Sequence, residues 1–85
     1  MKLSPHFDLV EFTRSSTAQS RHIDNTPNKT QTENLRFLCV QVLEPLREKF
    51  GPIIIGSGFR SESLNTAVGG VKNSQHISGE ACDIH

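Results

Sequence analysis

The 85-residue chain lacks several features that point to particular classes of protein. It has no tryptophan and only two cysteines, and its nine basic side chains balance its nine acidic ones. Neither sign of charge clusters, so the basic patch typical of proteins that bind nucleic acid or anionic membranes is missing. Two cysteines without C-x-x-C spacing give neither a disulfide framework nor a cysteine metal site, and we expect free, buried thiols.

Long apolar runs are also missing. The longest aliphatic run is Ile53–Ile55, far below the ~18–20 residues that a membrane helix needs. The segment Met1–His6 contains no apolar signal region. These absences predict a protein without a membrane span, cytoplasmic as synthesised, and the length predicts one small domain over residues 1–85.

Helix signals are present in the first half of the chain. Ser4 and Pro5 predict a short helix start over residues 4–12, as N-cap and first helical residue. A stronger helix is expected from Thr30 to Phe50, opened by the capping-box pattern Thr30-x-x-Glu33. Its predicted core face is an apolar stripe, made of Leu35, Leu38, Cys39, Val42, Leu46 and Phe50.

Proline and glycine interrupt this long helix. Pro45 lacks the N–H that would bond Gln41, so we expect a kink near residues 41–46. Gly51 and Pro52 then end the helix.

The second half of the chain predicts strands. Residues 53–55 form a β-branched run, Ser61 caps a short helix over residues 61–68, and a polar loop over residues 71–79 leads to a second strand at residues 81–85. Only one other strong strand is visible, so the edge of residues 81–85 is expected to be open. Either a short N-terminal strand that the pattern does not reveal covers this edge, or the C-terminal part of the domain is missing. An open edge predicts self-association or a marginally stable monomer.

The residues that bear chemistry lie in this last segment. His76-x-x-Gly79-x-Ala81-x-Asp83 contains an imidazole and a carboxylate, both of which zinc accepts as ligands. By spacing alone the signal is weak, and a lone loop histidine is more often an ordinary surface residue. In the expected strand Cys82 alternates away from Asp83 and faces the core.

Several further segments of the chain carry a family resemblance in their order and spacing. His76-x-x-Gly79-x-Ala81-x-Asp83, together with Ser57-Gly58-Phe59-Arg60-Ser61 and the opening Ser4-Pro5-His6-Phe7, resembles the zinc D-Ala-D-Ala carboxypeptidase family, in its compact, single-domain, endolysin-like branch. The resemblance implies an α+β fold of the hedgehog/DD-peptidase type, with helices packed on a small antiparallel sheet. It also implies a zinc metallopeptidase that acts on the stem peptides of peptidoglycan in the bacterial cell wall.

The same resemblance implies roles for individual residues. His76 and Asp83 match the family's zinc ligands, and Arg60 matches the arginine that holds the scissile carbonyl oxygen or a substrate carboxylate. Ser74 and Gln75 are then expected to line the substrate cleft. From the residues alone, Arg60 is equally able to pair with a nearby carboxylate, Glu62 or Asp83.

One part of the family pattern is missing. Members take a third zinc ligand and a glutamate base from a downstream segment that reads like Glu-x-x-Trp-x-His, and this chain has no tryptophan and ends at His85. His85 lies two residues after Asp83, so it either reaches the same ion or lies beside the cleft. Glu80 is the nearest acid, on the opposite strand face by parity.

Three hypotheses therefore stand for the 85-residue chain. The first is a zinc peptidase with weak activity, released to the cell wall by lysis. The second is a catalytically inactive module that binds cell-wall peptides, and the third is a structural subunit that needs a segment from a partner.

Overall fold

The computed structural model describes residues 1–84, and His85 lies outside the described residues. The α+β class expected from the sequence is confirmed, with helices and two small antiparallel sheets. In chain order the elements are β1 (Lys2–Ser4), β2 (Phe7–Asp8), α1 (Leu9–Thr13), α2 (Ser16–Arg21), α3 (Lys29–Leu38), the π-helical turn η1 (Cys39–Leu43), α4 (Glu44–Phe50), β3 (Ile55–Ser57), α5 (Glu62–Ala67), α6 (Gln75–Ser78) and β4 (Asp83–Ile84). No helix in this part of the chain is long and apolar enough to cross a membrane.

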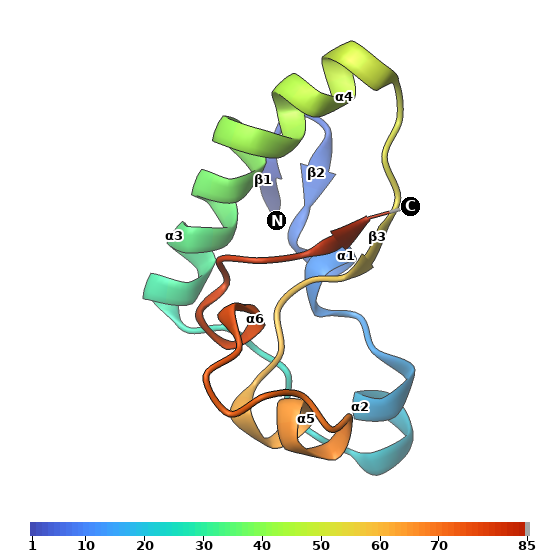
Figure 1. The fold of residues 1–85 in the computed structure, drawn as a ribbon, viewed down its shortest axis with the longest axis vertical. Coiled ribbons are helices and arrows are strands. Elements are labelled where there is room, and N and C mark those ends of the chain that lie inside the picture. The colour runs from blue at the N-terminus through green and yellow to red at the C-terminus, as the bar shows by residue number, and fades with distance from the viewer. Residues whose placement is uncertain (85) are drawn as a thin grey trace.

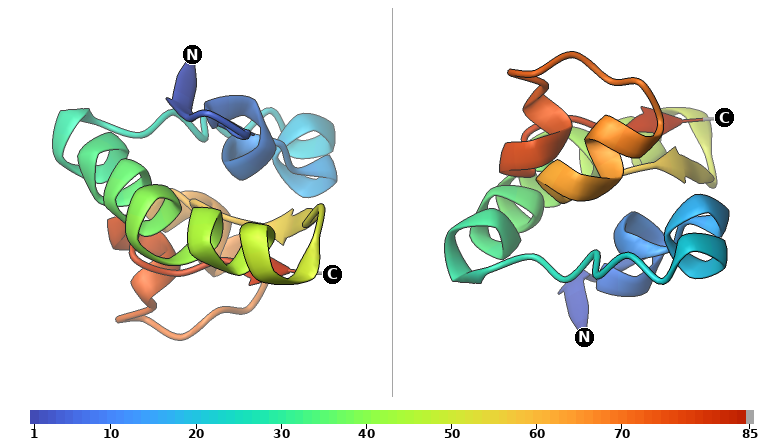
Figure 2. Two further views of the ribbon diagram at one scale, coloured as in Figure 1. Left: turned by 90° about the horizontal axis from the view of Figure 1, so that it is seen from above. Right: turned by 90° about the horizontal axis from the view of Figure 1, so that it is seen from below.

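The long helix α3–η1–α4 runs along one side of the molecule, and the N-terminal and C-terminal halves lie on either side of the core (Figures 1 and 2). β1 pairs with β2 in one sheet, and β3 pairs with β4 in the other. All three parts contribute fully buried side chains to one core, which comprises Leu3, Phe7, Phe12, Leu35, Cys39, Leu43, Ile55 and Phe59. Their burial supplies the main favourable free energy of folding.

The long helix begins and bends differently from the sequence expectation. Its capping box is made by Asn28 and Gln31, two residues before the predicted pair Thr30 and Glu33. The predicted disruption near Pro45 takes the form of the π-helical turn η1. η1 ends at Leu43 and α4 begins at the next residue, so Pro45 is the second residue of α4. A π-turn holds about one extra residue per turn, so its N–H groups bond carbonyls five residues back. This pattern accommodates Pro45, which has no N–H to donate to the carbonyl four residues back.

The π-turn also changes which side chains of the long helix are buried. Val42 and Phe50 of the predicted stripe are 48% and 69% exposed, whereas Leu43 is 2% exposed. The sequence prediction for Val42 and Phe50 was therefore wrong, because the extra residue rotates the later turns relative to an uninterrupted helix.

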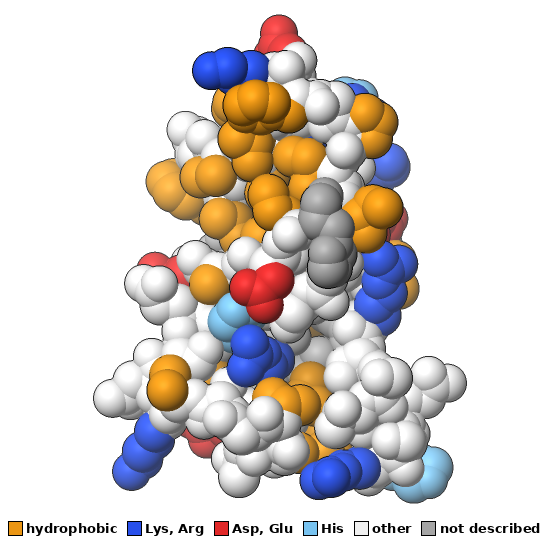
Figure 3. Space-filling model, turned by 45° about the vertical axis from the view of Figure 1, so that its right-hand side comes forward, with side chains coloured by type: hydrophobic (Ala, Val, Ile, Leu, Met, Phe, Trp, Pro, Cys, Tyr) orange, Lys and Arg blue, Asp and Glu red, His pale blue; other side chains and the backbone are white. Residues whose placement is uncertain are grey.

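A group of apolar side chains remains on the surface at the end of the molecule that carries α4 and the β3–β4 sheet (Figure 3). Phe50, Ile54 and Ile84 are among the exposed large hydrophobic residues. Ile54 precedes β3, which begins at Ile55, two residues later than the predicted start of the strand at Ile53. We refer to Phe50, Ile54 and Ile84 as the apolar end.

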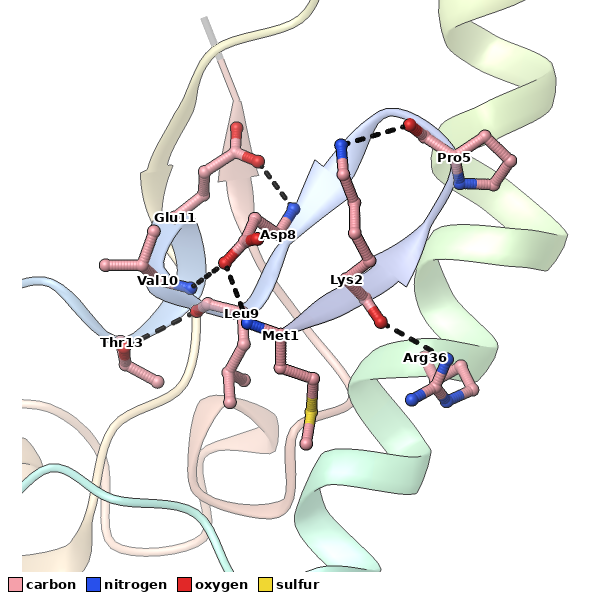
Figure 4. Close-up of polar contacts among 9 residues, drawn as sticks. All are labelled: Met1, Lys2, Pro5, Asp8, Leu9, Val10, Glu11, Thr13 and Arg36. Carbon is pink, nitrogen blue, oxygen red and sulfur yellow. Dashed lines mark hydrogen bonds and ion pairs between the residues drawn. The ribbon is translucent and has the colours of Figure 1, made fainter.

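The N-terminal segment is a β-hairpin followed by a short helix, not the helix predicted to start at Ser4. Asp8, not Ser4, is the N-cap, and it forms a capping box with Glu11 (Figure 4). Ser-Pro pairs occur in turns as readily as at helix starts, and here Pro5 lies in the turn between β1 and β2. Phe7 and Phe12 of this segment are buried, whereas Val10 is 59% exposed.

A cluster of Ser4, His6 and Glu44 ties this hairpin to the long helix. The Glu44 carboxylate accepts hydrogen bonds from Ser4 Oγ at 2.6 Å, from the His6 backbone N–H at 2.8 Å and from His6 Nδ1 at 2.7 Å. We call these three residues the Glu44 cluster. It joins residues about forty positions apart, and so fixes the hairpin against the start of α4.

Candidate functional site

The short helix α6 carries His76 and lies within the segment that was predicted to be a loop. Ser74 caps it, and Ser74 Oγ accepts the His76 N–H at 3.2 Å. Gly79 ends it with φ +81°, where an added Cβ would lie 2.5 Å from the Gln31 carbonyl oxygen. Glycine is required at this position by both the backbone angle and the close approach to α3.

Two amide side chains of α3 donate hydrogen bonds to backbone carbonyls of α6. Gln31 Nε2 donates to the Ile77 carbonyl at 3.0 Å, and Asn34 Nδ2 donates to the Ser78 carbonyl at 2.8 Å. These carbonyls belong to the last turn of α6 and have no partner within the helix. The contacts fix the helix that presents His76 to the rest of the site.

The His76 ring is held in one orientation. Its side chain is 13% exposed, and Nδ1 lies 2.6 Å from the Gly58 carbonyl oxygen. Because a carbonyl only accepts, Nδ1 carries the proton of the neutral ring and Nε2 keeps its lone pair. Nε2 faces Oδ1 of Asp83 at 3.9 Å, and the Asp83 side chain is 67% exposed.

This pair of donors fits a zinc ion. Zinc–nitrogen and zinc–oxygen distances sum to at most about 4.3 Å, so a 3.9 Å separation allows both atoms to contact one ion. Metal-bound histidines commonly donate their other ring N–H to a carbonyl or carboxylate, as Nδ1 of His76 does to Gly58. Among residues 1–84 no group of three His, Cys, Asp or Glu side chains able to hold a metal is present. The prediction for His85 falls on the residue that is not described.

Arg60 follows β3 and is linked directly to the His76 segment. Its backbone N–H donates to the His76 carbonyl at 3.0 Å, and its Nη1 donates to Asn65 Oδ1 at 3.0 Å. Within the described residues the guanidinium forms no ion pair with either Glu62 or Asp83.

Two separate hollows lie near these residues. One, of about 320 Å³, is lined by Arg60 and also by Arg14 and Ser57, with no acidic side chain. The other, of about 510 Å³, is lined by Ser74 and Gln75 and belongs to the α3–α5–α6 side. Figure 3 shows a histidine, an acidic and a basic side chain lying together below the apolar end. The structure thus brings His76, Asp83 and Arg60 into one region, whereas Ser74 and Gln75 line a different hollow.

Comparison with known proteins decides the family. Residues 5–85 match the model of a family described as Peptidase M15. The chain belongs to the peptidase M15 family. The zinc D-Ala-D-Ala carboxypeptidase of Streptomyces albus G is 43% identical to this M15 chain over 44 residues, which cover 49% of the chain and 17% of that relative. No solved structure matches the chain significantly. The family resemblance inferred from the motifs is confirmed.

Three residues that support the site of this M15 chain have no role in the motif-based assignments. They are Gly58, whose carbonyl orients His76, Asn65, which bonds the Arg60 guanidinium, and Asn25. Asn25 brackets Arg60 by donating to the Phe59 carbonyl at 3.1 Å and accepting the Ser61 N–H at 2.7 Å. Gly58 lies in the family-like segment Ser57-Gly58-Phe59-Arg60-Ser61. The Gly58–His76 and Asn25–Phe59 bonds span 18 and 34 residues, and the Asn65–Arg60 bond spans five, so none of them leaves a helix or strand spacing signal.

Proposed function

We propose that this M15 peptidase is zinc-dependent and cleaves the stem peptides of peptidoglycan. The observation that carries the proposal is the pair His76 Nε2 and Asp83 Oδ1 at 3.9 Å, with the histidine ring fixed through Nδ1. Family membership supports a peptidase, and the relative from Streptomyces albus G is named as a zinc enzyme.

Each site residue has a chemical role in this proposal. His76 and Asp83 hold the zinc ion, with His85 as the third protein ligand. When bound, zinc acts as a Lewis acid and lowers the pKa of a bound water. The Arg60 guanidinium binds the scissile carbonyl oxygen or a substrate carboxylate, because it stays charged and offers several N–H donors. Ser74 and Gln75 contact parts of the peptide substrate that lie away from the scissile bond.

A second candidate function is binding of cell-wall peptides without cleavage. It is favoured by the position of Glu80, which lines the same hollow as Ser74 and Gln75, a hollow that neither His76 nor Asp83 lines. Hydrolysis through a metal-bound water needs a base placed within hydrogen-bond reach of that water. A zinc-binding chain without such a base is expected to bind peptides but to turn them over slowly.

Zinc binding tests the metal assignment directly. Isothermal titration of the metal-free protein with zinc is expected to show one site, with at least tenfold weaker binding in His76→Ala and in Asp83→Ala. His22→Asn is the matched control, because His22 is an exposed histidine with φ +55°, a conformation that asparagine accepts. Affinity that is equal in all four proteins would contradict the metal assignment.

Product analysis separates the two functions. The zinc-loaded protein is incubated with purified peptidoglycan and with a synthetic stem peptide ending in D-Ala-D-Ala, and the products are identified by mass spectrometry. Released D-Ala or a cut stem peptide, lost in Arg60→Ala, supports the peptidase. Peptide binding without products supports the binding module, and neither binding nor products would contradict both.

A further inference from the structure

We propose that Asn65 is a positioning residue that fixes the Arg60 guanidinium in the site, an inference that rests on the proposed role of Arg60 in substrate binding. Asn65 is 2% exposed, although it is polar and lies on the short helix α5. Its Oδ1 accepts Arg60 Nη1 at 3.0 Å, and its Nδ2 donates to the Val71 carbonyl at 2.7 Å. Both ends of the amide are bonded, so the side chain has a single orientation with its oxygen toward Arg60.

Gly70 makes this contact sterically feasible. A Cβ at this position would lie 2.2 Å from Asn65 Oδ1 and 2.8 Å from Arg60 Nη1. The Gly70 N–H also donates to the Asn65 backbone carbonyl at 2.8 Å. Because any side chain here would displace the amide or the guanidinium, the second glycine of Gly69-Gly70 serves the arginine contact as well as the end of a helix.

The backbone of Arg60 is fixed independently of its side chain. Asn25 bonds the residue on each side of it, and the Arg60 N–H donates to the His76 carbonyl. Without Asn65, however, the long arginine side chain would still be free to change rotamer above this fixed backbone. Asn65 therefore supplies the restraint that the backbone contacts lack.

The neutrality of the amide is chemically important. A carboxylate at position 65 would pair with the guanidinium and cancel much of its charge, whereas an amide oxygen orients it and leaves the positive charge for a substrate oxygen. Among residues 1–84, Asn65 bonds the guanidinium through Nη1 alone, which leaves its other N–H donors facing away from this contact for a substrate. An arginine ordered before binding also loses less conformational entropy when the substrate arrives.

The restraint itself is measured without any substrate. In ¹⁵N spectra of the zinc-loaded protein, Arg60 is expected to show separate, slowly exchanging Nη signals. Asn65→Ala and Gly70→Ala should average them. Gly69→Asn is the matched control, because Gly69 has φ +74° and no atom within 4 Å of an added Cβ. Averaged Arg60 signals already present in the wild-type protein, or unchanged in Asn65→Ala, would overturn the proposal.

A double-mutant cycle tests whether Asn65 acts through Arg60. The affinity for a stem peptide ending in D-Ala-D-Ala is expected to fall about tenfold in Asn65→Ala, as for loss of a hydrogen bond to a charged group. It should fall no further when Asn65→Ala is added to Arg60→Ala. Additive losses would show a general structural role and overturn the positioning role. If no protein binds the peptide, the proposed function fails, while the ¹⁵N spectra still decide whether Asn65 restrains Arg60.

Discussion

The Glu44 cluster makes a quantitative prediction about stability in acid. Burial of the Glu44 carboxyl raises its pKa, but hydrogen bonds from Ser4 and His6 outweigh this and leave the pKa at about 2, against an ordinary value of 4.5. Glu44→Gln keeps a side chain of similar shape but removes the negative charge that strengthens these hydrogen bonds. In this variant His6 Nδ1 faces an amide, which has one acceptor oxygen and one NH₂ donor in place of the two acceptor oxygens of the carboxylate.

The magnitude follows from the pKa difference. A shift from 4.5 to about 2 corresponds to about 3 kcal/mol. Solvent screening at His6, whose side chain is 49% exposed, lowers this to about 2 kcal/mol. Because the folded-state pKa lies below the unfolded one, the stabilisation is complete above pH 4.5 and is lost as the pH falls toward 2. For a domain of this size, 2 kcal/mol lowers the midpoint of thermal unfolding by about 10 °C.

Thermal and urea unfolding measured from pH 7 to pH 2.5 check this reasoning. Wild-type protein is expected to lose stability below pH 4.5 more steeply than Glu44→Gln, so that the two curves approach each other in acid. Glu48→Gln, an exposed glutamate on the same helix, should behave as the wild type does. A constant difference between wild type and Glu44→Gln at every pH would refute the assignment of the acid sensitivity to Glu44.

Three further predictions follow from buried and exposed positions. Gly58→Ala places a Cβ 2.7 Å from Phe12 Cα. It should lower the free energy of unfolding in urea by about 1–3 kcal/mol and weaken zinc binding. An unchanged unfolding free energy and an unchanged zinc affinity would contradict the contact. Burial raises the pKa of the Cys39 thiol to about 12 and also raises the pKa of the less buried Cys82. Iodoacetamide at pH 8 should therefore label Cys82 first and Cys39 only after unfolding. Peptide mass mapping identifies the labelled cysteine. The β4 edge and the apolar end should drive self-association that Ile84→Lys reduces, and light scattering that finds a monomer at high concentration in both proteins would exclude it.

Local signals predicted the C-terminal half of the fold better than the N-terminal half. Ser61 caps α5, as its position before a short helical pattern predicted, and β4 pairs with β3. Ser4 was an ambiguous signal, because serine before proline occurs both at helix starts and in turns. The decisive local signal was Asp8 with Glu11 three residues later, a capping box that places the helix start after the hairpin.

The site was only partly predictable for a different reason. The motif placed His76 and Asp83 in one region because a glycine turn followed by a strand brings such residues together, and the structure separates their donor atoms by 3.9 Å. Asn25 could not be assigned a role, because it bonds Phe59 and Ser61, which lie far along the chain. Asn65 bonds Arg60 and Val71, five and six residues away, and these separations match no helix or strand period. Ser74 and Gln75 adjoin His76 in sequence but line another hollow, since a turn of helix directs neighbouring side chains to different sides.

The hydrogen bond between the Arg60 N–H and the His76 carbonyl makes residues 61–75 a loop with a closed base. Because this bond fixes both ends of the loop, its length can vary without moving Arg60 or His76. Doubling the length of a flexible loop adds only about 0.6 kcal/mol to the free energy of loop closure. Lys72 and Asn73 at its tip are exposed. Because Lys72 and Asn73 also line the hollow of Ser74 and Gln75, insertions there would change the shape of that hollow while His76 and Asp83 stay in place.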